Sequence, residues 1–217
     1  ISGFYDGLYC EYMNNSRIEQ MVVSGNTDDG VNLVGQNGQC DGNTLSGCTI
    51  SENGRVGVYL YGRDGQCNGN TIADCSISGN GDNGVFLYGR DGQCNGNTIA
   101  DCTISGNGID GVSLYNGNGQ CKGNTIQDNR ISQNTDRGIN LFTADGNRVE
   151  ANNIWGNVAY GIYSNSAQGN FVLKNTCVGN GTNYELDSDD TFGPIVEAVG
   201  ELGSADGAWH PWANFSR

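Results

Sequence analysis

Apolar and polar residues alternate with a period of two in short stretches along most of the chain. In one segment these stretches are Thr44-Leu45-Ser46, Thr49-Ile50-Ser51 and Val58-Tyr59-Leu60-Tyr61. Alternation with this period is typical of β-strands that bury one side. Because each stretch is followed by a bend rather than a hairpin turn, the three strands cannot pair with one another. We therefore predict short strands that pair with equivalent strands elsewhere in the chain.

The segment recurs along the chain. The tripeptide Gly-Gln-Cys repeats every 27 residues and ends at Cys40, Cys67, Cys94 and Cys121. A glycine followed by alternating apolar residues recurs further, at Gly7, Gly30, Gly57, Gly84, Gly111, Gly138 and Gly161. Equivalent strands of successive repeats can stack in parallel about 4.8 Å apart, and such crossovers are nearly always right-handed. The sequence thus predicts an all-β protein, a right-handed single-stranded parallel β-helix of about seven turns with a C-terminal cap.

Stacked turns place equivalent residues above one another in columns. Two aliphatic columns are expected to point inward: Cys10, Leu33, Leu60, Leu87, Leu114 and Leu141, and Val23, Ile50, Ile77, Ile104, Ile131, Ile154 and Cys177. A third column, at a turn, consists of Met21, Cys48, Cys75, Cys102, Asn129, Asn152 and Asn175. Its asparagine end is similar to the asparagine ladder of right-handed β-helix proteins, in which stacked amides bond one another and the turn backbone.

The pattern Asn-x-Ile-x-x-Asn-x-Ile-x-x-Asn followed by Gly-Ile-x-Leu resembles the repeats of pectate-lyase-like proteins, alginate epimerases and phage tailspikes. The resemblance covers roughly residues 1–180. It implies a β-helix with a substrate groove along one strand face. The Asp-Pro-His motif of alginate epimerases is absent, as are the paired-Asp and Gly-His-Gly motifs of polygalacturonases. The resemblance is therefore specific for the fold and not for one activity.

Composition narrows the classes of partner. The 217 residues include 36 glycines and 2 prolines, which indicates many tight turns rather than collagen or a disordered linker. The net charge of -14 argues against nucleic acid and anionic membrane surfaces as partners. No apolar run reaches the ~20 residues that a membrane helix needs.

The two ends of the sequence differ from the middle. Ile1-Ser2-Gly3 matches the interior of a repeat, so we expect residues 1–180 to be β-helix repeats without their N-terminal cap. Residues 181–217 lack the repeat but contain the apolar side chains to cover the last turn. They are expected to form a C-terminal capping segment.

The nine cysteines divide by position. Cys10 and Cys177 lie in aliphatic columns and are expected to be buried free thiols. Cys48, Cys75 and Cys102 form a cysteine ladder at the turn column. The loop column of Cys40, Cys67, Cys94 and Cys121 leaves two main alternatives, stacked thiols or vertical disulfides such as Cys40–Cys67 and Cys94–Cys121. A metal site is the less favoured alternative, since no histidine lies among these cysteines.

An aromatic column is expected on the outward side of the Gly-Val-x-Leu strand. It consists of Tyr61, Tyr88, Tyr115 and Phe142, flanked by Tyr59 and Phe86. Exposed ring faces stack on sugars, and a row with a spacing of about 4.8 Å suits an extended polysaccharide. The alternatives are that the rings pack only against one another or that they form a subunit interface.

Charged residues in the inserted loops are the candidates for catalysis. Arg63-Asp64 and Arg90-Asp91 follow the aromatic column, and Asn37, Asn118 and Asp145 take the place of the aspartate in other turns. Asp64 and Asp91 could form a carboxylate pair of the glycosidase type or share a calcium ion. In a lyase or epimerase, Arg63 or Arg90 would neutralise a uronate and a tyrosine would act as acid. The single histidine, His210, is expected to be structural.

These observations predict a secreted or surface-exposed β-helix that binds an acidic or neutral polysaccharide, as the C-terminal part of a polysaccharide-acting protein. The alternative is a homotrimeric phage-type spike or adhesin without catalytic activity, whose aromatic face is buried between subunits. The hydroxyl columns of Thr49, Ser76 and Thr103 and of Ser51, Ser78 and Ser105 leave an ice-binding or purely structural role as a third class.

Overall fold

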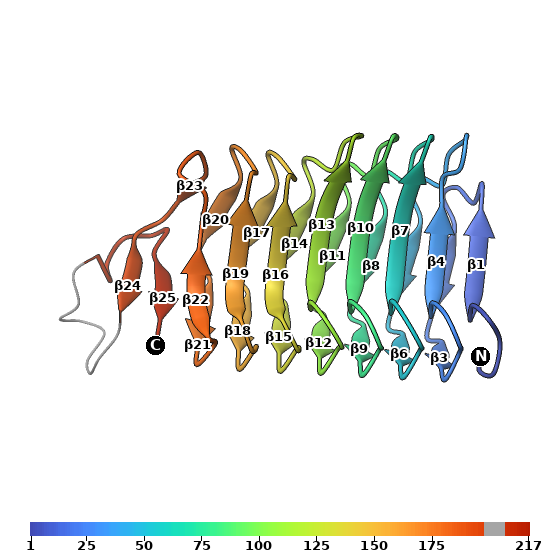
Figure 1. Ribbon diagram of the computed structural model, residues 1–217, viewed down its shortest axis with the longest axis horizontal. Helices are drawn as coiled ribbons and strands as arrows, with labels where there is room; N and C mark the ends of the chain where they lie inside the picture. The colour runs from blue at the N-terminus through green and yellow to red at the C-terminus, as the bar shows by residue number, and fades with distance from the viewer. Residues whose placement is uncertain (198–206) are drawn as a thin grey trace.

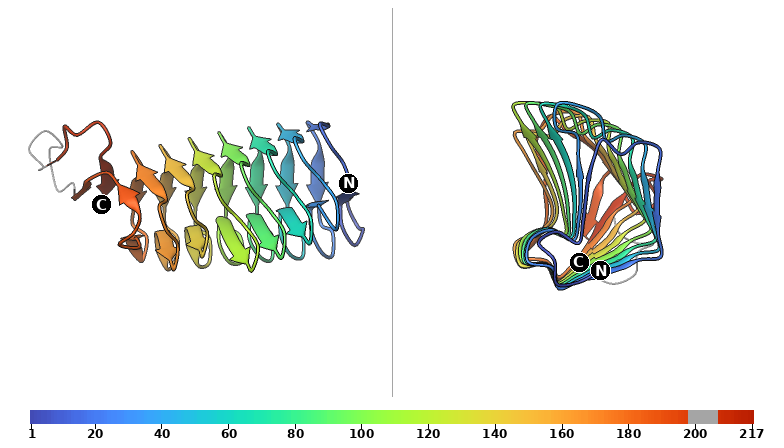
Figure 2. Two further views of the ribbon diagram at one scale, coloured as in Figure 1. Left: turned by 90° about the horizontal axis from the view of Figure 1, so that it is seen from above. Right: turned by 90° about the vertical axis from the view of Figure 1, so that its right-hand side faces the viewer.

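The computed structural model describes residues 1–197 and 207–217, and within them the chain is a right-handed parallel β-helix without helices (Figure 1). Each turn supplies one strand to each of three parallel sheets, here named A, B and C. Viewed along the long axis, the turns lie over one another (Figure 2). The predicted fold class is confirmed. No helix in the described residues is long and apolar enough to cross a membrane.

The strands of each sheet follow in chain order apart from the last two of sheet C. Sheet A consists of β1 (Leu8–Glu11), β4 (Val31–Val34), β7 (Val58–Arg63), β10 (Val85–Arg90), β13 (Val112–Gly117), β16 (Arg137–Phe142), β19 (Tyr160–Asn165) and β22 (Thr182–Glu185). Sheet B consists of β2 (Arg17–Glu19), β5 (Thr44–Ser46), β8 (Thr71–Ala73), β11 (Thr98–Ala100), β14 (Thr125–Gln127), β17 (Arg148–Glu150), β20 (Phe171–Leu173) and β23 (Thr191–Phe192). Sheet C consists of β3 (Val22–Ser24), β6 (Thr49–Ser51), β9 (Ser76–Ser78), β12 (Thr103–Ser105), β15 (Arg130–Ser132), β18 (Asn153–Trp155), β21 (Thr176–Val178), β25 (Asn214–Ser216) and β24 (Ile195–Glu197).

The glycine that recurs at the start of the sheet A strands is required by the close approach of successive turns. A Cβ atom at Gly111 would lie 2.7 Å from the carbonyl oxygen of Gly138 and 2.5 Å from Cγ2 of Ile131. The same conflict recurs at the other glycines of this column. A side chain here would have to push successive turns apart, which explains why glycine marks each repeat.

The two predicted aliphatic columns form the core. Leu33, Leu60 and Leu87 pair in register in sheet A, and Ile50, Ile77 and Ile104 do so in sheet C. Leucines and isoleucines of both columns are at most 2% exposed. Since a one-residue shift would turn these side chains to the solvent, the columns hold the register of the stack.

Buried asparagines form three ladders, whereas the sequence indicated only one. The expected ladder runs through Asn129, Asn152 and Asn175 and continues into Asn214, with each Oδ1 accepting bonds from the preceding turn. The second ladder consists of Asn43, Asn70, Asn97, Asn124, Asn147 and Asn170. The third consists of Asn26, Asn53, Asn80, Asn107, Asn134, Asn157 and Asn180. These amides pair the turn backbone groups that the strands leave unsatisfied.

All nine cysteines are free thiols, and eight of them are buried. The loop column of Cys40, Cys67, Cys94 and Cys121 lies in the core, at 0–1% exposure, rather than on the surface. Cys177 is buried as expected. Cys10 is only partly buried and packs against the core.

The C-terminal segment continues the stack before it covers it. β22 extends sheet A and β23 extends sheet B. The chain then returns, and β25 pairs with β21 while Tyr184 donates its hydroxyl hydrogen bond to the carbonyls of Asn175 and Phe215. Residues 198–206 of the expected cap lie outside the described residues.

Candidate functional site

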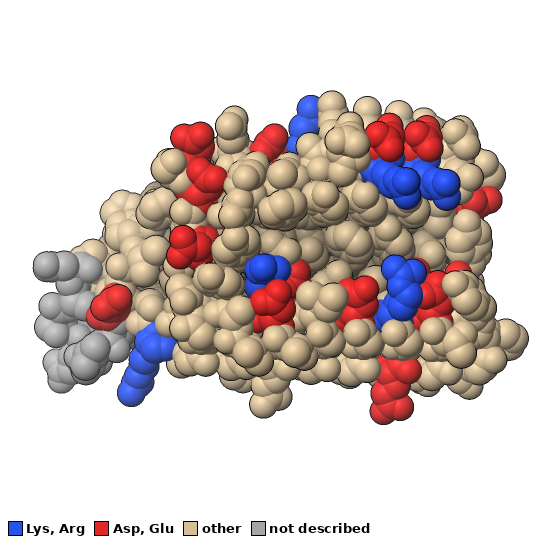
Figure 3. Space-filling view, viewed as in Figure 1, with Lys and Arg blue, Asp and Glu red and all other residues tan. Residues whose placement is uncertain are grey.

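The outward side of sheet A carries side chains that face away from the core and yet are largely covered. They share one register position of the sheet: Asn32, Tyr59, Phe86, Ser113, Asn140 and Tyr163. Four of them, Asn32, Tyr59, Ser113 and Asn140, are only 5–8% exposed. The space-filling view shows a hollow between two rows of charged residues on this face (Figure 3). We call this hollow the sheet A groove.

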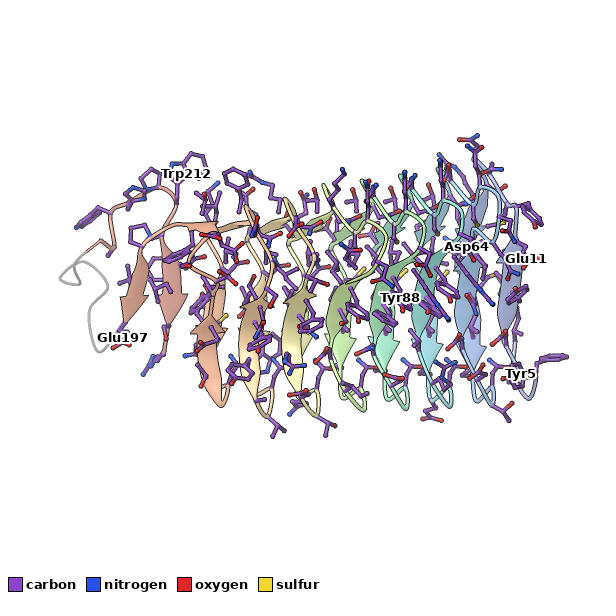
Figure 4. The ribbon with its side chains drawn as sticks, turned by 45° about the horizontal axis from the view of Figure 1, so that its top comes forward. Tyr5, Glu11, Asp64, Tyr88, Glu197 and Trp212 are labelled. Carbon is purple, nitrogen blue, oxygen red and sulfur yellow. The ribbon has the colours of Figure 1, made fainter. Side chains whose placement is uncertain are left out.

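The predicted aromatic column exists and borders the groove. Tyr61, Tyr88 and Tyr115 pair in register on consecutive strands, and Phe142 follows. The rings of Tyr61 and Tyr88 are 5.5 Å apart and within 9° of parallel, and those of Tyr88 and Tyr115 are 5.1 Å apart and within 8°. Tyr88 projects from the strand face in Figure 4. Gly117 leaves room for this ring, since a Cβ there would lie 2.4 Å from it.

This stacking corrects the expected mode of sugar contact. Both faces of the Tyr88 ring are covered by its neighbours, so a sugar cannot stack on them. Tyr59 is 8% exposed and stacks on Phe86, which places it in the groove floor. The column therefore presents ring edges and hydroxyl groups. Burial raises the pKa of Tyr88, so its hydroxyl is a neutral hydrogen-bond donor at physiological pH.

The loop residues proposed for catalysis meet at the rim of the groove. Nη1 of Arg90 donates to the Tyr61 hydroxyl at 3.4 Å, and Nε of Arg90 lies 4.0 Å from Asp91. The backbone of Arg63 forms an isolated antiparallel β-bridge with the backbone of Asp91. All four charged residues are exposed, and Asp64 is labelled on its loop in Figure 4. A shared calcium ion or a catalytic pair at Asp64 and Asp91 stays a prediction.

The backbone gives a second reason for aspartate in these loops. Asp64 and Asp91 have φ values of 51° and 53°, as do Asn37 and Asn118 at 53° and 66°. Asparagine and aspartate tolerate this left-handed conformation better than most residues. The interpretation of Asp145 as another member of this column was wrong. Its carboxylate instead accepts from Gln168 N at 2.9 Å, at the turn before sheet B.

The groove floor contains a polar cluster that the sequence did not indicate. Arg137 lies 3.6 Å from Asp110 and 3.0 Å from Asp136, and its guanidinium covers the ring of Tyr163 at 4.6 Å. Nδ2 of Asn140 donates to Asp110 at 2.9 Å. Burial raises the pKa of Asp110 against the opposing effect of its hydrogen bond to Asn140 and the charge of Arg137. Asp110 is thus saturated with protein partners and positions Arg137.

Several buried polar atoms of this face have no partner. They are Nε of Arg137 and the Oδ1 atoms of Asn32 and Asn140. Buried polar groups are nearly always hydrogen-bonded, so unsatisfied ones at a surface hollow indicate a place for water or a ligand. The donor and acceptors match the hydroxyl and carboxylate groups of a polysaccharide.

A group of three carboxylates lies at the N-terminal end of the same face. Ligand atoms of Asp6, Asp28 and Asp29 lie within 4.8 Å of one another. Arg55 pairs with Asp28 at 3.2 Å, and Asp29 accepts from Val56 N and Asn32. Burial raises the pKa of Asp29 to about 6. These carboxylates are occupied by protein donors, and they form the wall of the groove.

The sequence contained some signal for the polar floor. At the register position of Tyr59 and Phe86, the turns without an aromatic residue have Asn32, Ser113 and Asn140. The repeat spacing places Arg137 one turn after Asp110, but it does not report the direction of the two side chains, so their contact had no such signal. His210 lies away from the groove in the C-terminal segment, where its Nδ1 accepts from Trp212 N at 3.2 Å. A separate hollow of about 610 Å³ lies at the turns before sheet B, lined by Lys122, Asp145 and Gln168. It includes no residue of the sheet A groove.

Comparison with known proteins gives a family and a fold. Residues 6–192 match the family described as "Periplasmic copper-binding protein (NosD)". A search of curated proteins finds no match. Among solved structures, the periplasmic alginate epimerase AlgG superposes with a TM-score of 0.70 at 16% identity, over 98% of this chain and 46% of its own.

Two further solved structures share the architecture. The A-module of mannuronan C-5 epimerase AlgE6 from Azotobacter vinelandii superposes with a TM-score of 0.69 at 20% identity, over 94% of this chain and 58% of its own. Pectate lyase Pel9A superposes with a TM-score of 0.57 at 18% identity, over 79% of this chain and 52% of its own. The chain therefore spans about half the length of the solved structures that it matches. These likenesses show the β-helix fold.

Proposed function

This chain belongs to the NosD family, and from that premise we propose that it is a periplasmic or extracellular β-helix that binds an extended polysaccharide along the sheet A groove. The observation that carries the proposal is the presence of unpartnered buried polar atoms in the groove floor, at Arg137 and Asn140 in one turn and at Asn32 four turns away, beside a row of tyrosine hydroxyls. Proteins of the same architecture include epimerases and a lyase named for polysaccharide substrates.

The contacts would be polar rather than stacking contacts. Arg137 offers Nε–H to a hydroxyl or carboxylate, and Asn140 offers an acceptor on the same strand. Tyr61, Tyr88 and Tyr115 offer hydroxyl groups on consecutive turns, about 5 Å apart. An extended chain with a repeated pattern of hydroxyls can contact such a row at several points, and the individually small contributions then add.

The proposal is tested by retention on a panel of immobilised polysaccharides that includes alginate and pectate. Tyr88→Phe keeps the stacked ring and removes only the hydroxyl. Loss of one hydrogen bond of about 0.5–1.5 kcal/mol corresponds to about 2- to 10-fold weaker binding. Tyr5→Phe, the same change at a 71% exposed residue outside the row, is the matched control and should not alter retention.

The outcomes separate the alternatives. Retention that falls for Tyr88→Phe and not for Tyr5→Phe supports the groove. Absence of retention on every polysaccharide, or equal retention of the Tyr88→Phe variant, overturns it. If the solution mass is that of a stable trimer in which Tyr88 is protected from modification, the aromatic edge is instead a subunit interface of the spike type.

The family description names copper, so the donor atoms of the chain have to be compared with that metal. The only histidine, His210, is exposed in the C-terminal segment, and the chain has nine cysteines and two methionines. Thiolate and thioether sulfur select copper in its monovalent state. The residues therefore fit Cu(I), which would be held by sulfur in the coil interior.

A further inference from the structure

Nearly all sulfur atoms of the chain fall into two columns that run parallel to the axis of the coil. Sulfur column 1 consists of Met13, Cys40, Cys67, Cys94 and Cys121. Sulfur column 2 consists of Met21, Cys48, Cys75 and Cys102. Both methionines of the protein and seven of its nine cysteines are members. Only Cys10 and Cys177 lie outside.

Hydrogen bonds show that each methionine occupies the cysteine position one turn earlier. The carbonyl of Met13 accepts from Asn43 Nδ2 at 2.7 Å, as the carbonyl of Cys40 does from Asn70 at 3.0 Å. In column 2, Met21 N donates to Cys48 Sγ at 3.4 Å, as Cys75 N donates to Cys102 Sγ at 3.4 Å. Each column therefore begins with a thioether and continues with thiols on consecutive turns.

The column cysteines are buried, and each cysteine sulfur of column 1 lies beside an asparagine N–H donor. The column cysteines are 0–2% exposed. Nδ2 of Asn70 lies 3.4 Å from Sγ of Cys67, and Asn97 makes the same 3.4 Å contact with Cys94. Equivalent contacts follow at both ends of the column. N–H donors directed at sulfur stabilise a thiolate, because hydrogen bonds to a charged group favour its charged form.

We propose that the two sulfur columns bind Cu(I), each ion held between cysteine thiolates of consecutive turns. Strands of successive turns are about 4.8 Å apart. Zinc–sulfur bonds are about 2.3 Å long, and a two-coordinate ion with bonds of about that length spans about 4.6 Å between its sulfur ligands. The rise of the coil thus matches the length of a linear sulfur–copper–sulfur unit. Binding converts two thiols and one Cu(I) into a bis-thiolate complex of charge -1 and releases two protons, without a redox step.

Each column also contains a thioether. Met13 and Met21 are partly buried and pack against the end of the core. A thioether is a neutral soft ligand that also suits Cu(I). Four thiols in column 1 and three in column 2 make two pairs and one pair, so we expect about three ions per chain. This inference uses the interior of the coil and is independent of polysaccharide binding by sheet A.

The test is an anaerobic titration of the fully reduced protein with Cu(I) in competition with bicinchoninate. We expect the protein to withdraw about three equivalents, with a thiolate-to-metal absorption band in the near ultraviolet that rises to the same end point. The double variant Cys67→Ala/Cys94→Ala leaves no adjacent thiols in column 1 and should lose two equivalents. Cys75→Asn leaves no adjacent thiols in column 2 and should lose one.

These substitutions are ones that the coil already accepts at the same positions. Ala144 and Ala167 continue column 1 in later turns. Like the cysteines of that column, each of them lies three residues before a ladder asparagine. In column 2, Asn129 takes the next position after Cys102. Cys177→Ala removes a buried thiol outside the columns and is the matched control. Far-ultraviolet circular dichroism verifies that each variant is folded. A folded protein that withdraws no Cu(I), or variants that keep the wild-type stoichiometry, would overturn the proposal.

Discussion

Asp29→Asn is expected to stabilise the protein at neutral pH and to lose that advantage in acid. Asp29 is 1% exposed, and burial raises its pKa to about 6 despite the charge of Arg55. An aspartate in an unfolded chain has a pKa of about 3.9. The folded protein therefore binds this proton more tightly than the unfolded chain, so stability is highest below about pH 4 and falls as the pH rises towards 6.

The magnitude follows from the difference of two pKa units. It corresponds to about 3 kcal/mol of destabilisation above pH 6, which asparagine avoids because it carries no charge. Part of this gain is offset, since Oδ1 and Oδ2 of Asp29 accept from Val56 N at 3.1 Å and from Asn32 at 3.0 Å. A net gain of about 1–2 kcal/mol is expected, or about 2–8 °C in Tm for a chain of this size.

The coil already contains asparagine at this position. Asn83 lies two turns later and accepts from Asp110 N at 3.0 Å, as Asp29 accepts from Val56 N. Oδ1 of Asn32 has no partner. If the side-chain amide of Asn32 rotates by half a turn, this oxygen can accept a hydrogen bond from the amide of the substituted residue. The substitution should therefore fit without strain.

The assay is thermal unfolding of the wild type and the variant at pH 4 and pH 7.5, followed by circular dichroism. The difference in Tm should be positive at pH 7.5 and close to zero or negative at pH 4. Asp64→Asn is the control, because Asp64 is exposed and asparagine tolerates its φ of 51° equally well. A gain that is the same at both pH values, or a loss at pH 7.5, would refute the reasoning.

Two further predictions concern the stability of the stack. Asn107→Ala removes the acceptor of two bonds from Asn80 and one bond donated to the next ladder residue, so a loss of about 3–5 kcal/mol, or about 10 °C in Tm, is expected in a thermal melt. Gly111→Ala places a Cβ 2.7 Å from the Gly138 carbonyl and should cost more than 3 kcal/mol, whereas Gly96→Ala, with a φ of +64° and open space, should cost only about 1–2 kcal/mol. Equal Tm values for the two glycine variants would mean that successive turns separate more easily than the structure indicates.

Much of the fold follows from the sequence because of the solenoid itself. Residues 27 apart become neighbours, so the repeat alone predicts that Leu60 stacks on Leu87 and Ile50 on Ile77. The aromatic column of Tyr61, Tyr88 and Tyr115 was predictable for the same reason. The roles of single side chains were harder to predict, since they depend on direction as well as on register.

Tertiary structure decided what each column does. The 5.1 Å separation of the Tyr88 and Tyr115 rings covers the faces that were expected to contact sugars. The repeat spacing places Arg137 one turn after Asp110, but their contact depends on the direction of both side chains, which the spacing does not report. Met13 lies 27 residues before Cys40, and the shared hydrogen bonds of consecutive turns show that the two residues occupy equivalent positions.

The sequence alone therefore determined which residues stack, because a regular period translates directly into a row with the rise of a parallel sheet. Only the tertiary structure decided which atoms of those residues face the solvent, which face one another and which remain unpartnered. The physical reason is that register depends on the backbone period, whereas exposure depends on side-chain rotamers and on the turns that surround each strand.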